Sequence, residues 1–288
     1  MPPFDYDAAD CETNNDRPMT LTFKNAPLVE LIAELRWREP FSPLAGVHHP
    51  LQGLSAPLDQ FFIRLGGELY QHGFQQVERL VPPNFPVLPM QAVYRFRRLA
   101  TADTSMLFQV GDGTFSAHAV PPYHSWGAVK GTVENGITAL LKARSLEGKE
   151  LPSITTAILR YINAFGSNLT GDRQIRGFLE EVLGLRIELP PALSRHVQPG
   201  ATIKTNLSLG LPLSTGANMT FMVGEGTVRN EPKFVLDMAV AYTKKLPDDL
   251  GELMGIFDEA RTTIHSTFVA LTKPIEGLLE PIGGSNVP

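Results

Sequence analysis

The sequence predicts an α+β protein made of two similar halves, each with the element order β-α-β-β-β-α. One observation is that apolar and polar residues alternate in short segments, as they do in strands with one buried face. Another is that apolar residues recur at steps of three and four in longer segments, as in amphipathic helices. These segments follow each other in the same order twice along the 288 residues.

The first half begins with a strand at 28–37, where Leu31 and Leu35 alternate with Glu30 and Glu34. A loop rich in proline, glycine and histidine follows. The other expected elements of this half are a helix at 58–74, strands at 92–99, 105–110 and 114–120, and a helix from Ser125, which is available as N-cap.

The helix expected from Ser125 has an apolar face that must pack against a sheet. Six large side chains recur along it at steps of mostly three and four. Burying them would contribute on the order of 10 kcal/mol before entropy, at roughly 1.5 to 3 kcal/mol each. They are Trp126, Val129, Val133, Ile137, Leu140 and Leu141.

The second half repeats this order. Its elements are a strand at 153–165, a helix at 171–185, strands at 201–214, 218–226 and 233–245, and a long closing helix with Leu253 to Leu271 on its apolar face. The two first strands also share a signature, "AELRW" at 33–37 and "AILRY" at 157–161. We therefore expect an internal duplication.

The expected organisation is a disordered acidic tail at 1–20, a first half at 21–150 and a second half at 151–288. The halves are expected to pack as one body with pseudo-two-fold symmetry. In such a body antiparallel sheets are covered by long helices, as in the saddle of the TATA-binding protein or in helix-grip folds.

Charge and composition exclude several classes of protein. The net charge is −5, but residues 1–20 hold five carboxylates against Arg17, so the body is nearly neutral and gives no electrostatic argument for nucleic acid. No apolar run is long enough for a membrane span, and the N-terminus does not resemble a signal peptide. We expect a cytoplasmic protein with no membrane partner. The single cysteine, Cys11, permits no internal disulfide.

Four segments together resemble an uncharacterised bacterial family described as the sporadically distributed proteins. They are "FKNAPLVELIAELRW", "FQVGDGTFSAHAVPPYHSW", "LRYINAF" and "EARTTIHSTFVAL", spread over about residues 22 to 273. The resemblance implies patchy occurrence and an accessory role, and it transfers no catalytic residue. This chain has His118 where the family's middle motif often has asparagine.

The segment 108–126 is the strongest candidate for chemistry, because it combines histidines, an aspartate between glycines and aromatic residues. Gly111-Asp112-Gly113 lacks the flanking pattern of a phosphate loop and is typical of a hairpin turn. His118 could be a general base, but it alternates with Thr114 and Ser116 as a polar-face strand residue does. The segment is therefore predicted to be a hairpin leading into a helix.

No other motif predicts an enzyme or a metal centre. His48, His49 and His72 lack the spacing of metal ligands, and no serine, cysteine or lysine lies in a nucleophile motif. We expect no catalytic residue, no metal and no cofactor. Arg95 and Arg97 share one strand face, where they either touch phosphates or pair with Glu30 or Glu34 on a neighbouring strand.

The residues that best discriminate between functions are Arg36 and Arg160, which are equivalent if the chain is duplicated. Each is either half of an internal ion pair or part of a recognition surface. The candidate binding residues are Glu30, Glu34, Arg36, Arg160, Tyr161 and Asn163.

The function expected from the sequence is that of a non-enzymatic binding protein. Its partner would be another protein, in an accessory, toxin-neutralising or regulatory role. One alternative is a small-ligand or enzyme site in a cavity between the sheet and its two long helices. Another is a nucleic-acid saddle with a basic stripe along Arg36, Arg95 and Arg97, which is less favoured. The oligomeric state stays open.

Overall fold

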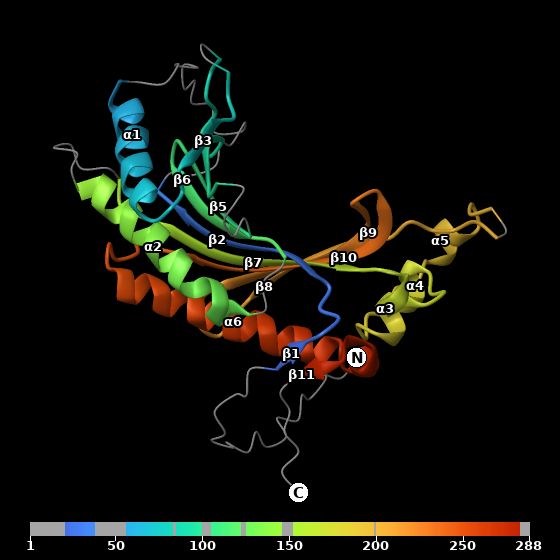
Figure 1. Ribbon diagram of the computed structural model, residues 1–288. Helices are drawn as coiled ribbons and strands as arrows, with labels where there is room; N and C mark the ends of the chain where they lie inside the picture. The colour runs from blue at the N-terminus through green and yellow to red at the C-terminus, as the bar shows by residue number, and fades with distance from the viewer. Residues whose placement is uncertain are drawn as a thin grey trace, which may run out of the picture.

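The computed structural model describes residues 21–37, 56–82, 85–99, 105–121, 125–145, 152–198 and 200–282 (Figure 1). These residues form a mixed α+β protein with one large antiparallel sheet and seven α-helices. The tail at 1–20 and the side chains of Cys11, His48 and His49 lie outside the described residues. Within these ranges, no helix combines the length and the apolar character that crossing a membrane requires.

The sheet has nine strands in the order β3-β4-β5-β6-β2-β7-β10-β9-β8, and every neighbouring pair is antiparallel. It is continuous across the two halves of the chain, because β2 pairs with β7 at its centre. The bounds are β2 Leu28–Arg36, β3 Gln76–Arg79, β4 Ala92–Arg97, β5 Met106–Gly111, β6 Thr114–Ala119, β7 Thr156–Phe165, β8 Asn206–Pro212, β9 Asn218–Val228 and β10 Glu231–Thr243.

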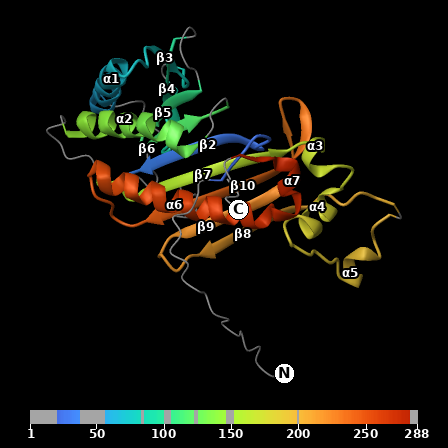
Figure 2. The same ribbon diagram turned by 60° about the horizontal axis from the view of Figure 1, so that its bottom comes forward.

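The three long helices lie on one face of this sheet, and α2 and α6 cross it side by side (Figures 1 and 2). Strands of alternating pattern need such a cover for their apolar face. The helices are α1 Ala56–Gln71, α2 Trp126–Ser145, α3 Ser167–Thr170, α4 Ile175–Glu181, α5 Pro191–Ser194, α6 Leu250–Leu271 and α7 Glu276–Leu279.

Helix α2 begins where the sequence predicts it. The Ser125 hydroxyl accepts a hydrogen bond from the amide of Ala128 at 3.3 Å, as an N-cap does. Gly136 brings the helix close to the sheet, because a Cβ atom at this position would lie 2.2 Å from the ring of Phe108. Glycine in α1 has a similar role, since Gly66 faces the ring of Phe96.

Helix α6 is joined to α2 by polar contacts around one carboxylate. Asp258 accepts a hydrogen bond from the Trp126 indole at 2.7 Å and one from the Lys130 ammonium at 2.8 Å. Asp258, whose side chain is 43% exposed, therefore links the two covering helices.

The two halves share one pairing scheme. In each half the first strand lies at the centre of the sheet and pairs with the last strand, β2 with β6 and β7 with β10. The remaining strands then follow outward as β5, β4 and as β9, β8. The first half has an additional edge strand, β3, which the sequence pattern did not predict because its residues are all exposed.

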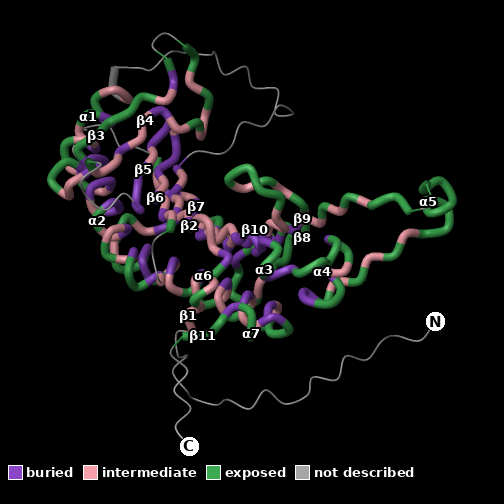
Figure 3. Tube along the Cα trace, turned by 45° about the vertical axis from the view of Figure 1, so that its right-hand side comes forward, coloured by how far each residue is buried: buried purple, intermediate pink, exposed green. Residues whose placement is uncertain are grey.

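The halves differ in the segment between their first and second strands. The first half contains the 16-residue helix α1. The second half has the short helices α3, α4 and α5 instead, and the segment around α5 projects from the body and is largely exposed (Figure 3). Near its root the rings of Phe165, Phe178 and Phe234 are in contact, with centroid separations of 5.0 and 5.3 Å.

The first and last strands of the described residues form a second, two-stranded sheet. β1 (Thr22–Phe23) pairs antiparallel with β11 (Pro281–Ile282), and the Lys24 ammonium lies 2.7 Å from the carboxylate of Glu280. The beginning and the end of the described body therefore lie beside each other.

Candidate functional site

The sheet has a second face that the three long helices do not cover. On β2, Leu31 and Leu35 are buried under the helices, so the residues that alternate with them point to the opposite face. We call this the open face. Near the centre of the sheet it is formed by Glu30, Ile32, Glu34 and Arg36 of β2, Ser116 and His118 of β6, Leu107 and Gln109 of β5, Arg95 and Arg97 of β4, Ile158, Arg160 and Ile162 of β7, and Asp237 of β10.

Arg160 forms an ion pair with two hydrogen bonds on the open face. Its guanidinium donates two hydrogen bonds to the carboxylate of Asp237 on the neighbouring strand β10, from Nε at 2.8 Å and from Nη2. The Asp237 side chain is only 10% exposed, whereas that of Arg160 is 40% exposed. The hydrogen bonds with Asp237 raise the pKa of Arg160. The internal ion pair considered for Arg160 is therefore present.

Arg36 also has an internal partner, on its own strand. Its Nε atom lies 2.6 Å from Oε1 of Glu34, which also accepts a hydrogen bond from the hydroxyl of Thr114 at 3.1 Å. Arg36 and Arg160 occupy related places, because Arg36 pairs with Thr156 and Arg160 with Ile32 across the central strand pair.

His118 lies between two polar partners on the open face. Its Nε2 atom is 2.9 Å from the hydroxyl of Ser116, and its Nδ1 atom is 2.8 Å from Oε1 of Glu30. The imidazole is 13% exposed. His118 is thus a polar-face strand residue, as its alternation predicts, but it is not simply solvated.

Two of the candidate binding residues do not belong to this group. Tyr161 and Asn163 alternate with Arg160 and therefore lie on the helix-covered face. Asn163 is buried and its amide donates to the carbonyl of Leu236 at 3.5 Å. Tyr161 interacts with Arg261 of α6, and burial raises the pKa of its hydroxyl. The structure brings together Glu30, Glu34, Arg36 and Arg160.

The structure also corrects the expected pairing of Arg95. Its guanidinium lies 3.2 Å from Glu78 of the edge strand β3, not beside Glu30 or Glu34. The reason is topological, because β5 and β6 separate β4 from β2 in the sheet. Gly111-Asp112-Gly113 is the expected hairpin turn, in which Gly113 has a φ of 95°.

Sequence reasoning missed Asp237, which is the partner of Arg160. A signal was present, because Asp237 is the single charged residue in the apolar run "FVLDMAVAY". A carboxylate in such a run is costly to bury unless it is paired.

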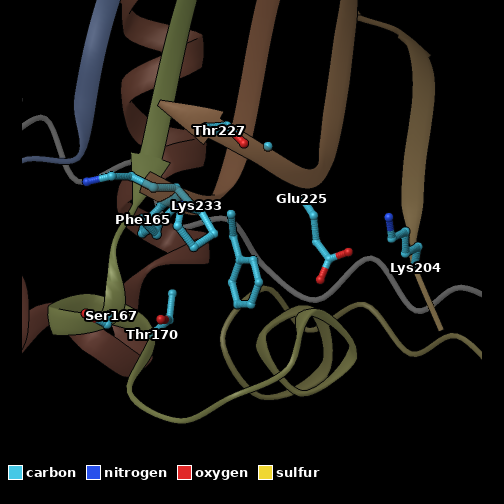
Figure 4. Close-up of a pocket in the computed structure, with 10 residues that line it drawn as sticks. Phe165, Ser167, Thr170, Lys204, Glu225, Thr227 and Lys233 are labelled. Atoms are coloured by element: carbon cyan, nitrogen blue, oxygen red, sulfur yellow. The ribbon is translucent and has the colours of Figure 1, made fainter. Parts of the chain in front are cut away.

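One hollow lies away from the central strands of the open face, and no residue of α1, α2 or α6 lines it. It measures about 520 Å³ and lies between α3 and the β9–β10 hairpin (Figure 4). Lys204, Glu225 and Lys233 contribute its charged groups. Among the described residues, no three histidine, cysteine, aspartate or glutamate side chains group as metal ligands do.

The class of protein defined so far is an α+β protein with one open sheet face lined by paired charges. Comparisons with protein families, with curated proteins and with solved structures find no match to this chain.

Proposed function

We propose that this protein binds another protein through the open face of its central strands. The observation that carries the proposal is the composition of this face. Paired charges alternate there with the partly exposed side chains of Ile32, Ile158 and Ile162. Protein interfaces combine an apolar centre with a polar rim, and three isoleucines among charged neighbours supply this combination.

The charges of the open face favour a protein over a nucleic acid. A nucleic-acid saddle would need a continuous run of free positive charge. Here Glu34 lies against Arg36 and Glu78 lies against Arg95. The carboxylates interrupt the basic stripe that the sequence suggested, and they supply acceptors for a partner's lysine or arginine side chains.

We further propose that the two halves arose by internal duplication, as in saddle-like folds. The shared pairing scheme of the halves supports this. So does the register of the central strands, where Arg36 and Arg160 lie two residues to either side of the pair formed by Glu34 and Ile158. A partner would then meet two similar arginines related by a pseudo-two-fold axis. The accessory or toxin-neutralising role rests on the family resemblance.

A small-ligand site is the second candidate. The hollow in Figure 4 supports it, since Lys204 and Lys233 could attract an anionic ligand. Two features weigh against it. Glu225 lies in the same hollow, and Lys233 is already 3.1 Å from Glu231.

The proposal is tested by comparing partner capture between two matched variants. Ile158→Arg adds a bulky charge to the open face, and Ile63→Arg adds the same charge to α1, where Ile63 is 74% exposed. A partner of the open face is lost with Ile158→Arg and retained with Ile63→Arg. Urea unfolding confirms that both variants fold.

The capture is made from the native host with and without nuclease. Loss of all captured material after nuclease would favour the nucleic-acid saddle instead. Equal capture by both variants would contradict the proposal.

A further inference from the structure

Ser116, His118 and Glu30 form a continuous hydrogen-bonded chain on the open face. The hydroxyl of Ser116 lies 2.9 Å from Nε2 of His118, and Nδ1 of His118 lies 2.8 Å from Glu30. A hydroxyl, an imidazole and a carboxylate in this order match the arrangement that activates a serine nucleophile. We propose that Ser116 is such a nucleophile and that the protein hydrolyses carboxylic esters at this site. This goes beyond the proposed binding function.

The sheet explains how the three groups meet. Ser116 and His118 are alternate residues of β6, so both side chains point to the open face. Glu30 reaches His118 from the neighbouring strand β2, where Ile32 is the direct partner of His118. The site is therefore held by the regular backbone of adjacent strands rather than by a loop, and this limits the movement of all three groups.

Each member has a distinct role. The Glu30 carboxylate can only accept, so it binds the Nδ1–H tautomer of His118 and leaves the Nε2 lone pair facing Ser116. His118 is then the base that accepts the proton of the serine hydroxyl. Glu30 does not touch the substrate and is a positioning residue.

The neighbours of the chain suit this role. Leu107 and Ile32 are the cross-strand partners of His118, whose imidazole is only 13% exposed. Ser116 is partly exposed on this face, where an acyl group would approach it. Ser116 has two direct cross-strand partners, Glu34 on β2 and Gln109 on β5, and of these only the neutral amide of Gln109 can donate a hydrogen bond to a developing oxyanion.

The proposed reaction has two balanced steps. In the first, Ser116 Oγ forms a bond to the ester carbonyl carbon, its proton passes to Nε2 of His118, and the leaving alkoxide departs with that proton. In the second, water attacks the acyl-serine, Nε2 takes a proton from the water, and Ser116 Oγ leaves and recovers it. The products are one carboxylic acid and one alcohol.

The test uses a fluorophosphonate, which forms a P–O bond with an activated serine as its P–F bond breaks and fluoride leaves. The full chain is incubated with the probe, and the modified residue is identified by peptide mass spectrometry. We expect an adduct on Ser116 that disappears in Ser116→Ala. His118→Asn should lower its rate of formation by about 100-fold or more.

Matched control variants distinguish an activated Ser116 from general reactivity of the protein with the fluorophosphonate. Ser208→Ala removes a serine of the same sheet face on β8, and His196→Asn removes an exposed histidine. Both should leave the rate unchanged. Ester hydrolysis is followed with p-nitrophenyl acetate, for which Glu30→Gln should lower kcat by about 10-fold or more while KM stays unchanged.

Unfolding midpoints of all variants are measured alongside. A folded wild-type protein with no adduct on Ser116, or with an adduct that forms equally fast in His118→Asn, would overturn the proposal. Neither result would affect the binding test, which depends on Ile158.

Discussion

The two faces of the central sheet are stabilised by different interactions, although the residues that form them are neighbours in the sequence. On β7, Leu159 is fully buried under the helices, and Arg160 next to it is bound to Asp237 on the open face. The covered face is stabilised by burial of apolar area, which needs good packing but no particular partner. On the open face most charged side chains lie in specific pairs, and each such pair requires a partner of opposite charge at one particular position. Stability should therefore depend mainly on the first face and specificity on the second.

The largest effect is expected from a substitution on the covered face. Leu159→Ala should lower the free energy of unfolding by about 2 to 5 kcal/mol, because it removes a fully buried side chain and leaves a cavity. Its neighbour Ile158 on the open face is the matched control, and Ile158→Ala should cost less than about 1 kcal/mol. Urea unfolding measures both. Similar losses of unfolding free energy for the two variants would show that the side chain of Ile158 is as well packed as that of Leu159.

A smaller loss is expected when the pair of Arg160 and Asp237 is broken. Arg160→Met keeps most of the apolar stem but leaves the Asp237 carboxylate, which is 10% exposed, without its cation. We expect a loss of about 1 to 3 kcal/mol, less than the roughly 3 to 5 kcal/mol of a fully buried pair.

Adding Asp237→Asn to Arg160→Met should recover part of that loss. Arg36→Met is the comparison on β2, where Glu34 keeps its hydrogen bond from Thr114 and the loss should stay below about 1 kcal/mol. If Arg160→Met and Arg36→Met lower the free energy of unfolding equally, then the greater burial of Asp237 than of Glu34 does not determine the loss.

Two glycines of α2 should respond with opposite signs. Gly136→Ala places a Cβ atom against Phe108 on the covered face and should destabilise by about 1 to 3 kcal/mol. Gly131 has no atom within 4 Å of the corresponding position, so Gly131→Ala should stabilise by up to about 1 kcal/mol through helix propensity. Thermal unfolding compares them. A gain for Gly136→Ala would mean that α2 does not pack this closely.

The smallest effect concerns the pH dependence of stability. Burial and the positive charge of Arg261 lower the pKa of His265, so the folded state binds its proton less readily than the unfolded state. The contribution of His265 is then complete above the ordinary pKa of 6.5 and is lost as the pH falls through that value. In His265→Gln the unfolding midpoint should decline less between about pH 8 and about pH 5 than in wild type. A decline in His265→Gln as large as in wild type would refute this.

Periodicity predicted which residues alternate but not which strands become neighbours. The strands at 28–37, 114–120 and 153–165 and the long helices are all present, because each depends on local repetition. The partner of Arg160 could not be predicted, since Asp237 is distant in the sequence and becomes adjacent through the β7–β10 pairing. Arg95 was assigned to the wrong carboxylates for the same reason.

The error over Tyr161 and Asn163 is of another kind, because the sequence contained what was needed to avoid it. Both residues have the parity of Leu159 on β7, so a period of two places them on the covered face. Grouping them with Arg160 joined residues that are close in sequence but point to opposite sides of one strand. The strand β3 carried no such signal, since all four of its residues are exposed.

The clasp between β1 and β11 determines how the protein should respond to a mechanical load. Thr22 pairs with Ile282 and Phe23 with Pro281, so the outermost residues of both strands are partners. A force that pulls residues 21 and 282 apart would act on these bonds one after another, as in the opening of a zipper, rather than shearing them together. The β1–β11 pair and the neighbouring ion pair of Lys24 and Glu280 should therefore separate at low force. The nine-stranded sheet should bear the load only after they have separated.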